Sequence, residues 1–222
     1  SILAFVLIKS LESGNVKSSN IGLAFAWFNL LVSLIVFLFI FYTKNLFNES
    51  SLREIKNTYL NNLNLENEQL IDQIGLLIDT TYPILPFLNA LSFILITILN
   101  LTISYKLISI LKFRPLIKIS FDNFFIPNWY LYIFCFVMLS YFLSPQDFSS
   151  ALLNTFLTTS ILFVFKGNLI FLKILNKFNI NSYLKLLLLF LLFIFFSYLL
   201  VIFLFVLGLI NKIDDVYKSI KD

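Results

Sequence analysis

Residues 186–210 carry no charged side chain over 25 consecutive positions, and this run constrains the fold more than any other feature. Aliphatic residues and phenylalanine fill it, interrupted by Ser197, Tyr198 and Gly208. An α-helix rises about 1.5 Å per residue and a bilayer core is about 30 Å thick, so about 20 apolar residues cross it. Because a helix of a soluble protein is rarely apolar on all sides, the run predicts a transmembrane helix.

The composition agrees with a lipid environment. Of the 222 residues, 59% are hydrophobic and 13% are charged. Soluble domains carry about 25% charged residues, so this chain has too little polar surface to cover a globule in water. We expect an all-α, polytopic transmembrane helix bundle, located as a multi-pass protein in the cell membrane with the lipid bilayer as its first partner.

Uncharged stretches recur along the chain and predict five full spans within a single membrane domain, residues 1–222. The spans lie at residues 21–43, 82–105, 125–143, 149–172 and 185–210. The apolar residues 1–8 are interpreted as the end of a further, partial span.

Residues 44–79 form a polar connection that is predicted to be an extramembrane amphipathic segment. Ser51 and Glu54 have the spacing of a capping box, in which both side chains satisfy free amides at a helix start. Apolar residues then recur at helical spacing in two sets, which predicts two short helices broken near residues 61–64. The segment either packs on the bundle or membrane surface, or docks a partner.

Polar side chains inside the uncharged stretches are the candidate binding residues. Asn89 and Asn100 belong to a stripe on the 82–105 span that would face protein or a cavity, since unpaired polar groups in lipid cost free energy. Lys166-Gly167-Asn168 interrupts the 149–172 span, where Lys166 snorkels or the helix unwinds near a polar site. The tentative substrate-binding set is Asn89, Asn100, Asn154, Thr158, Lys166 and Asn168.

The distribution of basic residues predicts an orientation. Residues 106–122 and 166–185 carry four basic residues each, and positive loops stay in the cytoplasm. The acidic segment 44–79 is then outside. With five spans, the tail after residue 210 then lies outside too. In the alternative orientation the tail lies inside.

Catalytic chemistry is not indicated by the sequence. Histidine is absent and Cys135 is the single cysteine, so a histidine base and a cysteine metal site are both excluded. Motifs of phosphate-binding loops, zinc proteases and serine hydrolases are also absent. We expect no enzyme activity, no cofactor and no metal. The net charge of +4 is explained by cytoplasmic loops, so no nucleic-acid partner is expected.

Two short stretches of the chain are distinctive. Phe124-Phe-Ile-Pro127-Asn-Trp129 opens a span after a basic segment, and Gly208-Leu-Ile-Asn211 is followed by Asp215 to Lys218. In these stretches the chain resembles the YybS-like family of uncharacterised bacterial integral membrane proteins. The resemblance implies the bacterial inner membrane. Its layout is similar to the substrate-binding subunits of energy-coupling-factor transporters, which implies a compact ligand between helices.

Two functions follow as expectations. The preferred one is an integral membrane protein that binds or transports a small molecule in a helix-bundle cavity. The other is a non-catalytic membrane scaffold or assembly protein, which docks a membrane-protein partner through residues 44–79.

Overall fold

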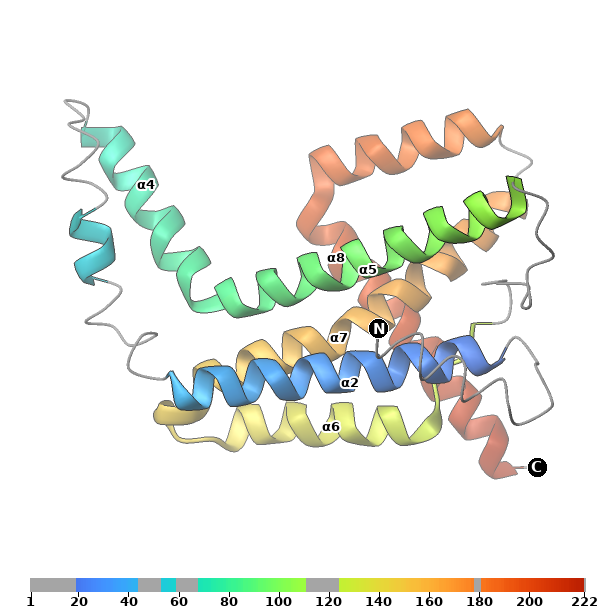
Figure 1. Cartoon of the computed structure of the whole chain (residues 1–222), viewed down its shortest axis with the longest axis horizontal. Helices are drawn as coiled ribbons and strands as arrows, with labels where there is room; N and C mark the ends of the chain where they lie inside the picture. The colour runs from blue at the N-terminus through green and yellow to red at the C-terminus, as the bar shows by residue number, and fades with distance from the viewer. Residues whose placement is uncertain (1–18, 44–52, 59–67, 111–123, 178–180, 222) are drawn as a thin grey trace. The chain divides into compact units, whose positions relative to one another are not determined.

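All regular structure in the described part of the chain is helical, which confirms the predicted all-α fold (Figure 1). The computed structural model describes residues 19–43, 53–58, 68–110, 124–177 and 181–221. Its elements are α2 (Ser19–Tyr42), α4 (Glu68–Thr81), the 3-10 turn η2 (Tyr82–Ile84), α5 (Leu85–Ile110), α6 (Asn128–Leu143), α7 (Gln146–Lys177) and α8 (Ser182–Lys221). The partial span 1–8 and the break near 61–64 lie outside the described residues.

Three helical stretches in these ranges are long and apolar enough to cross a membrane, namely Gly22–Tyr42, Leu70–Asn100 and Phe148–Lys177. The second begins before the predicted span 82–105, because α4 continues through η2 into α5. α6 is apolar but has 16 residues, whereas a helical crossing needs about 20.

Beside its apolar core, this fold buries several polar side chains and exposes many large apolar ones. The polar side chains of Asn29, Ser33, Asn154, Thr155, Thr158 and Thr159 are buried. Large apolar side chains are exposed on the described helices, among them Phe136 and Phe142 of α6 at 71% each. Because unpaired polar groups are costly in hydrocarbon and apolar ones are not, this arrangement is expected of helices that face lipid.

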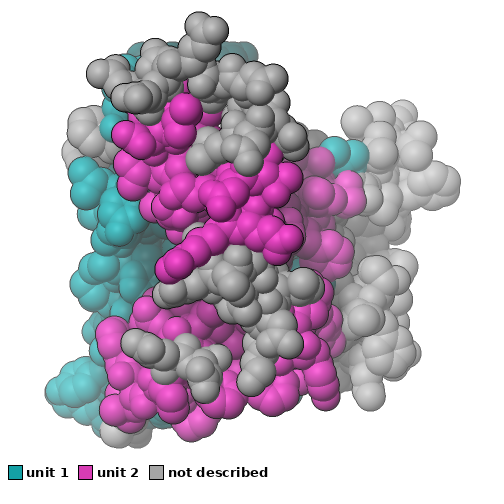
Figure 2. All heavy atoms as spheres, turned by 90° about the vertical axis from the view of Figure 1, so that its left-hand side faces the viewer, with its two compact units in different colours: residues 1–30, 101–135, 159–222 teal, residues 31–100, 136–158 magenta. Residues whose placement is uncertain are grey.

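The chain divides into two compact units, each built from several helices (Figure 2). Unit 1 comprises Ser1–Leu30, Leu101–Cys135 and Thr159–Asp222. Unit 2 comprises Leu31–Asn100 and Phe136–Thr158.

Unit 1 is organised around Tyr130, which is fully buried at the start of α6. Its hydroxyl donates 2.6 Å to Asn29 Oδ1 of α2 and lies 2.9 Å from the Thr159 carbonyl oxygen of α7. The Tyr130 ring also packs on Phe163. Since a single hydroxyl proton is available, the two oxygens share it, and this contact ties three helices together.

α8 bends within unit 1, which differs from the single straight crossing that the uncharged run predicts. Gly208 of α8 packs against Gly167 of α7. The helix from Gly167 to Lys177 spans about 15 Å, whereas a straight helix from Ser182 to Gly208 would span about 39 Å. The few residues between the helices reach at most about 17 Å, so a straight α8 would carry Gly208 past Gly167. α8 must therefore turn back, and Figure 1 shows the bend.

In unit 2, residues 53–58 form a helical turn that is held against α4. Lys56 Nζ lies 2.6 Å from Asp79 Oδ2, and its side chain covers Gly75. α4 and α5 meet at a sharp angle at η2, where Pro83 stands (Figure 1). Of the two short helices predicted on either side of 61–64, the second is present as α4, and the first is described as helical over residues 53–58.

Candidate functional site

Asn154 is fully buried on α7 and has all its usual hydrogen-bond partners within unit 2. Its Oδ1 accepts from the Phe87 amide at 2.9 Å. Its Nδ2 donates to the carbonyl oxygens of Pro83 and Ser150, at 2.8 Å each. Because the first amides of a helix lack intrahelical acceptors, Asn154 acts as a cap supplied from another helix to the start of α5.

Thr158 lies one turn further along α7 and is also fully buried. Its hydroxyl donates 2.7 Å to the Asn154 carbonyl oxygen of the same helix. The structure therefore brings Asn154 and Thr158 together, and their polar atoms are engaged in packing the helices.

Asn89 and Asn100 have exposed side chains on α5. The hydroxyls of Ser92 and Thr97 donate to carbonyl oxygens of their own helix, at 2.9 and 2.8 Å. The two asparagines neither line the pocket described below nor contact Asn154 through a hydrogen bond among the described residues.

The helix is continuous through Lys166-Gly167-Asn168, so the alternative of an unwound helix there is wrong. Gly167 is buried because the α8 backbone passes over it, and a Cβ on Gly167 would overlap the Leu204 carbonyl oxygen. A Cβ on Gly208 would likewise overlap the Phe163 carbonyl oxygen. Glycine is required at this crossing for close approach, while Asn168 lies half-buried beside it.

Lys166 points to the non-helical segment that precedes α6. Its Nζ donates 2.5 Å to the Phe124 carbonyl oxygen, a backbone acceptor outside any helix. Phe124 and Phe165 pack edge to face with ring centroids 5.1 Å apart. Lys166 thus satisfies non-helical backbone rather than extending freely along the helix.

Lys212 is the residue of this region that sequence reasoning missed. It was grouped with the tail, but it is 1% exposed. Its Nζ donates 2.5 Å to Asn128 Oδ1 and lies 4.2 Å above the centre of the Phe125 ring. One sequence signal does point to its burial: Lys212 lies four residues after Gly208, and residues four apart share a helix face.

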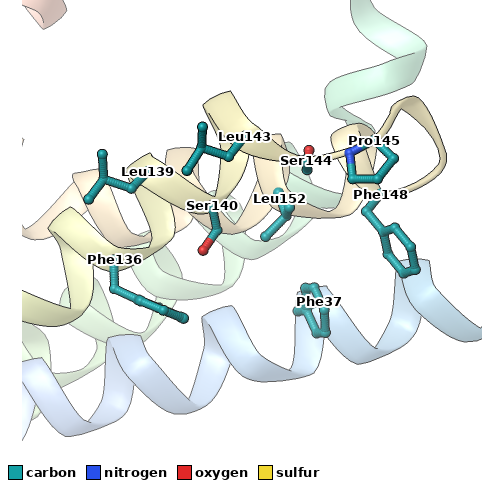
Figure 3. Close-up of a pocket in the computed structure, with 9 residues that line it drawn as sticks. All are labelled: Phe37, Phe136, Leu139, Ser140, Leu143, Ser144, Pro145, Phe148 and Leu152. Carbon is teal, nitrogen blue, oxygen red and sulfur yellow. The ribbon is translucent and has the colours of Figure 1, made fainter.

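A cavity in unit 2 has apolar walls and a volume of about 560 Å³ (Figure 3). Phe37 of α2 lies on one side, and residues of α6 and the start of α7 lie on the other. The lining residues are Phe37, Phe136, Leu139, Ser140, Leu143, Ser144, Pro145, Phe148 and Leu152. None of the six sequence-predicted binding residues is among them.

Ser140 is the one hydroxyl of this lining that is not engaged elsewhere among the described residues. The Ser144 hydroxyl donates 3.2 Å to the Tyr141 carbonyl oxygen. The Ser140 hydroxyl forms no hydrogen bond with the described part of the chain, and Figure 3 shows it directed from α6 toward α2.

Comparison with known proteins adds no relative. No protein-family model matches this chain, and no match is found among curated proteins or solved structures. Within the described ranges, no group of three or more histidine, cysteine or acidic side chains is placed to hold a metal ion.

Proposed function

We propose that this chain is a multi-pass protein of the bacterial inner membrane that binds a small, largely apolar molecule in the helix-bundle pocket of unit 2 and moves it across the bilayer. The pocket carries the proposal. Its volume of about 560 Å³ falls within the range of about 300–1,000 Å³ that is usual for ligand sites. Apolar walls with one unengaged hydroxyl, that of Ser140, favour a ligand with a single polar group.

Two of the residues that the sequence suggests for ligand binding, Asn154 and Thr158, instead hold the helices together. Asn154 and Thr158 already use their polar atoms within the protein. A polar ligand would have to displace these bonds, whereas an apolar ligand in the pocket displaces none of them. For this reason an apolar or amphiphilic molecule fits the pocket better than a polar one.

For the topology we propose that α2, α5, α6 and α7 cross the membrane and that α8 enters it and returns, in place of a fifth straight crossing. Lys212 contacts Asn128 at the start of α6, so the tail lies at the same end as that start. This arrangement places 13 of the 16 basic residues on the cytoplasmic side, and five straight crossings place ten there.

The pocket is tested by photolabelling the protein in lipid nanodiscs with a photoreactive eight-carbon alcohol. We expect labelled peptides from α6 and the start of α7, with labelling competed by octanol. Ser140→Leu should abolish it by filling the pocket and removing the hydroxyl. Ser92→Leu, a matched change on an exposed face of α5, should leave it unchanged.

Transport is tested separately by the release of octanoate-type and alcohol-type fluorescent probes from proteoliposomes. Labelling without release would keep the binding site and remove the transport function. Equal labelling of the wild type and Ser140→Leu would overturn the pocket itself.

A scaffold function is the second candidate, favoured by one observation on α4. Leu76 and Leu77 are each 64% exposed, on the helix that the Lys56–Asp79 pair joins to residues 53–58. If this surface docks a membrane-protein partner, Leu76→Asn with Leu77→Asn should release a partner that co-purifies with the wild type. Photolabelling of the pocket should be unaffected by this change.

A further inference from the structure

Two ammonium groups converge in unit 1 where α7 and α8 cross. Gly208 packs on Gly167, and Lys212 follows Gly208 by one helical turn while Lys166 adjoins Gly167. Each ammonium contacts the segment from Phe124 to Asn128, Lys166 through the Phe124 carbonyl oxygen and Lys212 through Asn128 Oδ1.

These ammonium groups are incompletely satisfied by the protein. A lysine ammonium has three N–H donors, and within the described residues each of the two uses one in a hydrogen bond. Neither lysine forms an ion pair with a described carboxylate. Lys212 is nevertheless 1% exposed, and a buried charge without compensation costs considerable free energy.

Among the residues that the structure describes, positive charge predominates at this site. Asp215 is the described acidic group that attracts both Lys166 and Lys212, so these two positive charges face one described negative charge. Burial lowers the pKa of Lys212 to about 8, with the repulsion from Lys166 adding to this effect. Lys212 and Asp215 follow the uncharged run 186–210, and Lys212 contacts Asn128. In the proposed topology this is the depth of the lipid headgroups.

We propose that Lys166, Lys212 and Asn128 form a binding site for a phosphate-type anion. The free ammonium donors would bind its oxygens, and so would the Asn128 amide, which now donates a long 3.5 Å hydrogen bond to Ser219 Oγ. The Phe125 ring forms one wall. Basic pockets between membrane helices on the cytoplasmic side bind anionic lipid headgroups, and lysine is a usual phosphate ligand. An anionic phospholipid and free phosphate share this chemistry, and the site is independent of the pocket in unit 2.

The test compares thermal unfolding in phosphatidylcholine nanodiscs under three conditions: no addition, added phosphatidylglycerol, and added inorganic phosphate. We expect at least one of the two anions to raise the unfolding midpoint of the wild type in a concentration-dependent way. Stabilisation by phosphatidylglycerol alone identifies the lipid headgroup, and stabilisation by phosphate identifies a soluble ligand. The absence of both effects would overturn the proposal.

Substitutions of Lys166, Lys212 and Asp215 distinguish anion binding at this site from a role in helix packing alone. Lys212→Met and Lys166→Met should weaken the apparent affinity for the anion about tenfold or more, since each removes a charged hydrogen bond. Asp215→Asn should strengthen it by removing a repulsive carboxylate. Lys218→Met is the matched control, because Lys218 is exposed and paired with Asp214 at 2.6 Å.

Asp215→Asn keeps the experiment decisive if a lysine variant fails to fold. Equal affinity in Asp215→Asn and the wild type, or an equal loss in Lys218→Met, would contradict a site at these residues. Restored affinity in Lys212→Arg, which keeps the charge, would support it.

Discussion

A buried asparagine such as Asn154 has the same sequence signal whether it binds a ligand or another helix. The structure shows three hydrogen bonds to backbone groups, which use both amide hydrogens and one of the two acceptor positions on the amide oxygen. In the sequence, a buried asparagine that stabilises the fold therefore looks the same as one that binds a ligand.

Asn154→Leu is expected to destabilise the protein in the absence of any ligand. It leaves the Phe87 amide and the Pro83 carbonyl oxygen without their partner, at a cost of about 1–3 kcal/mol for each unsatisfied group. The free energy of unfolding, measured by SDS titration in mixed micelles, should fall accordingly. Asn100→Leu, on an exposed face of α5, should change it little.

Lys212 is expected to make stability depend on alkaline pH. Burial lowers its pKa to about 8 from the ordinary 10.5, so between these values the unfolded chain binds more protons than the folded one. The free energy of unfolding should therefore rise as pH increases from about 8 toward 10, as the neutral amine becomes compatible with burial. Lys212→Met should remove this component of the slope, and a falling slope in the wild type would contradict the assignment.

At the scale of elements, the α7–α8 crossing depends on the absence of side chains. Gly167→Ala and Gly208→Ala are each expected to destabilise strongly, because the new methyl group would overlap a backbone carbonyl oxygen that a rotamer change cannot move. Thermal unfolding in nanodiscs measures the effect.

Gly75→Ala is the matched control for that crossing. Its Cβ would meet Lys56 Cε at 2.9 Å, near the end of a flexible side chain. Alanine also gains about 1 kcal/mol in helix propensity over glycine, so the variant should be neutral or slightly stabilising. A loss equal to that of Gly208→Ala would show that the crossing has no special requirement for glycine.

For the whole molecule, the proposed topology predicts which residues share a side of the membrane. In a Cys135→Ser background, Lys177→Cys and Lys221→Cys should react with a membrane-impermeant maleimide only after permeabilisation of cells. Arg53→Cys should react in intact cells. Reaction of Lys221→Cys in intact cells would instead support five straight crossings with the tail outside.

The helical class and the apolar stretches were predictable from the sequence because both follow from local properties, length and hydrophobicity. Figure 1 shows what was not predictable, the bend that returns α8 to the crossing with α7. Gly167 and Gly208 are 41 positions apart, so no local spacing motif records their contact. The role of Lys212 was missed for the same reason, since its partner Asn128 comes from a distant segment.

The contact between Gly167 and Gly208 also fixes the register of α8 against α7. If α8 slid by one residue, Leu207 or Leu209 would replace Gly208 against the α7 backbone, and neither leaves room for it. The register is thereby locked without any polar bond between the glycines. It follows that the spacing between the ammonium groups of Lys166 and Lys212, which repel each other, is set by two residues that carry no charge.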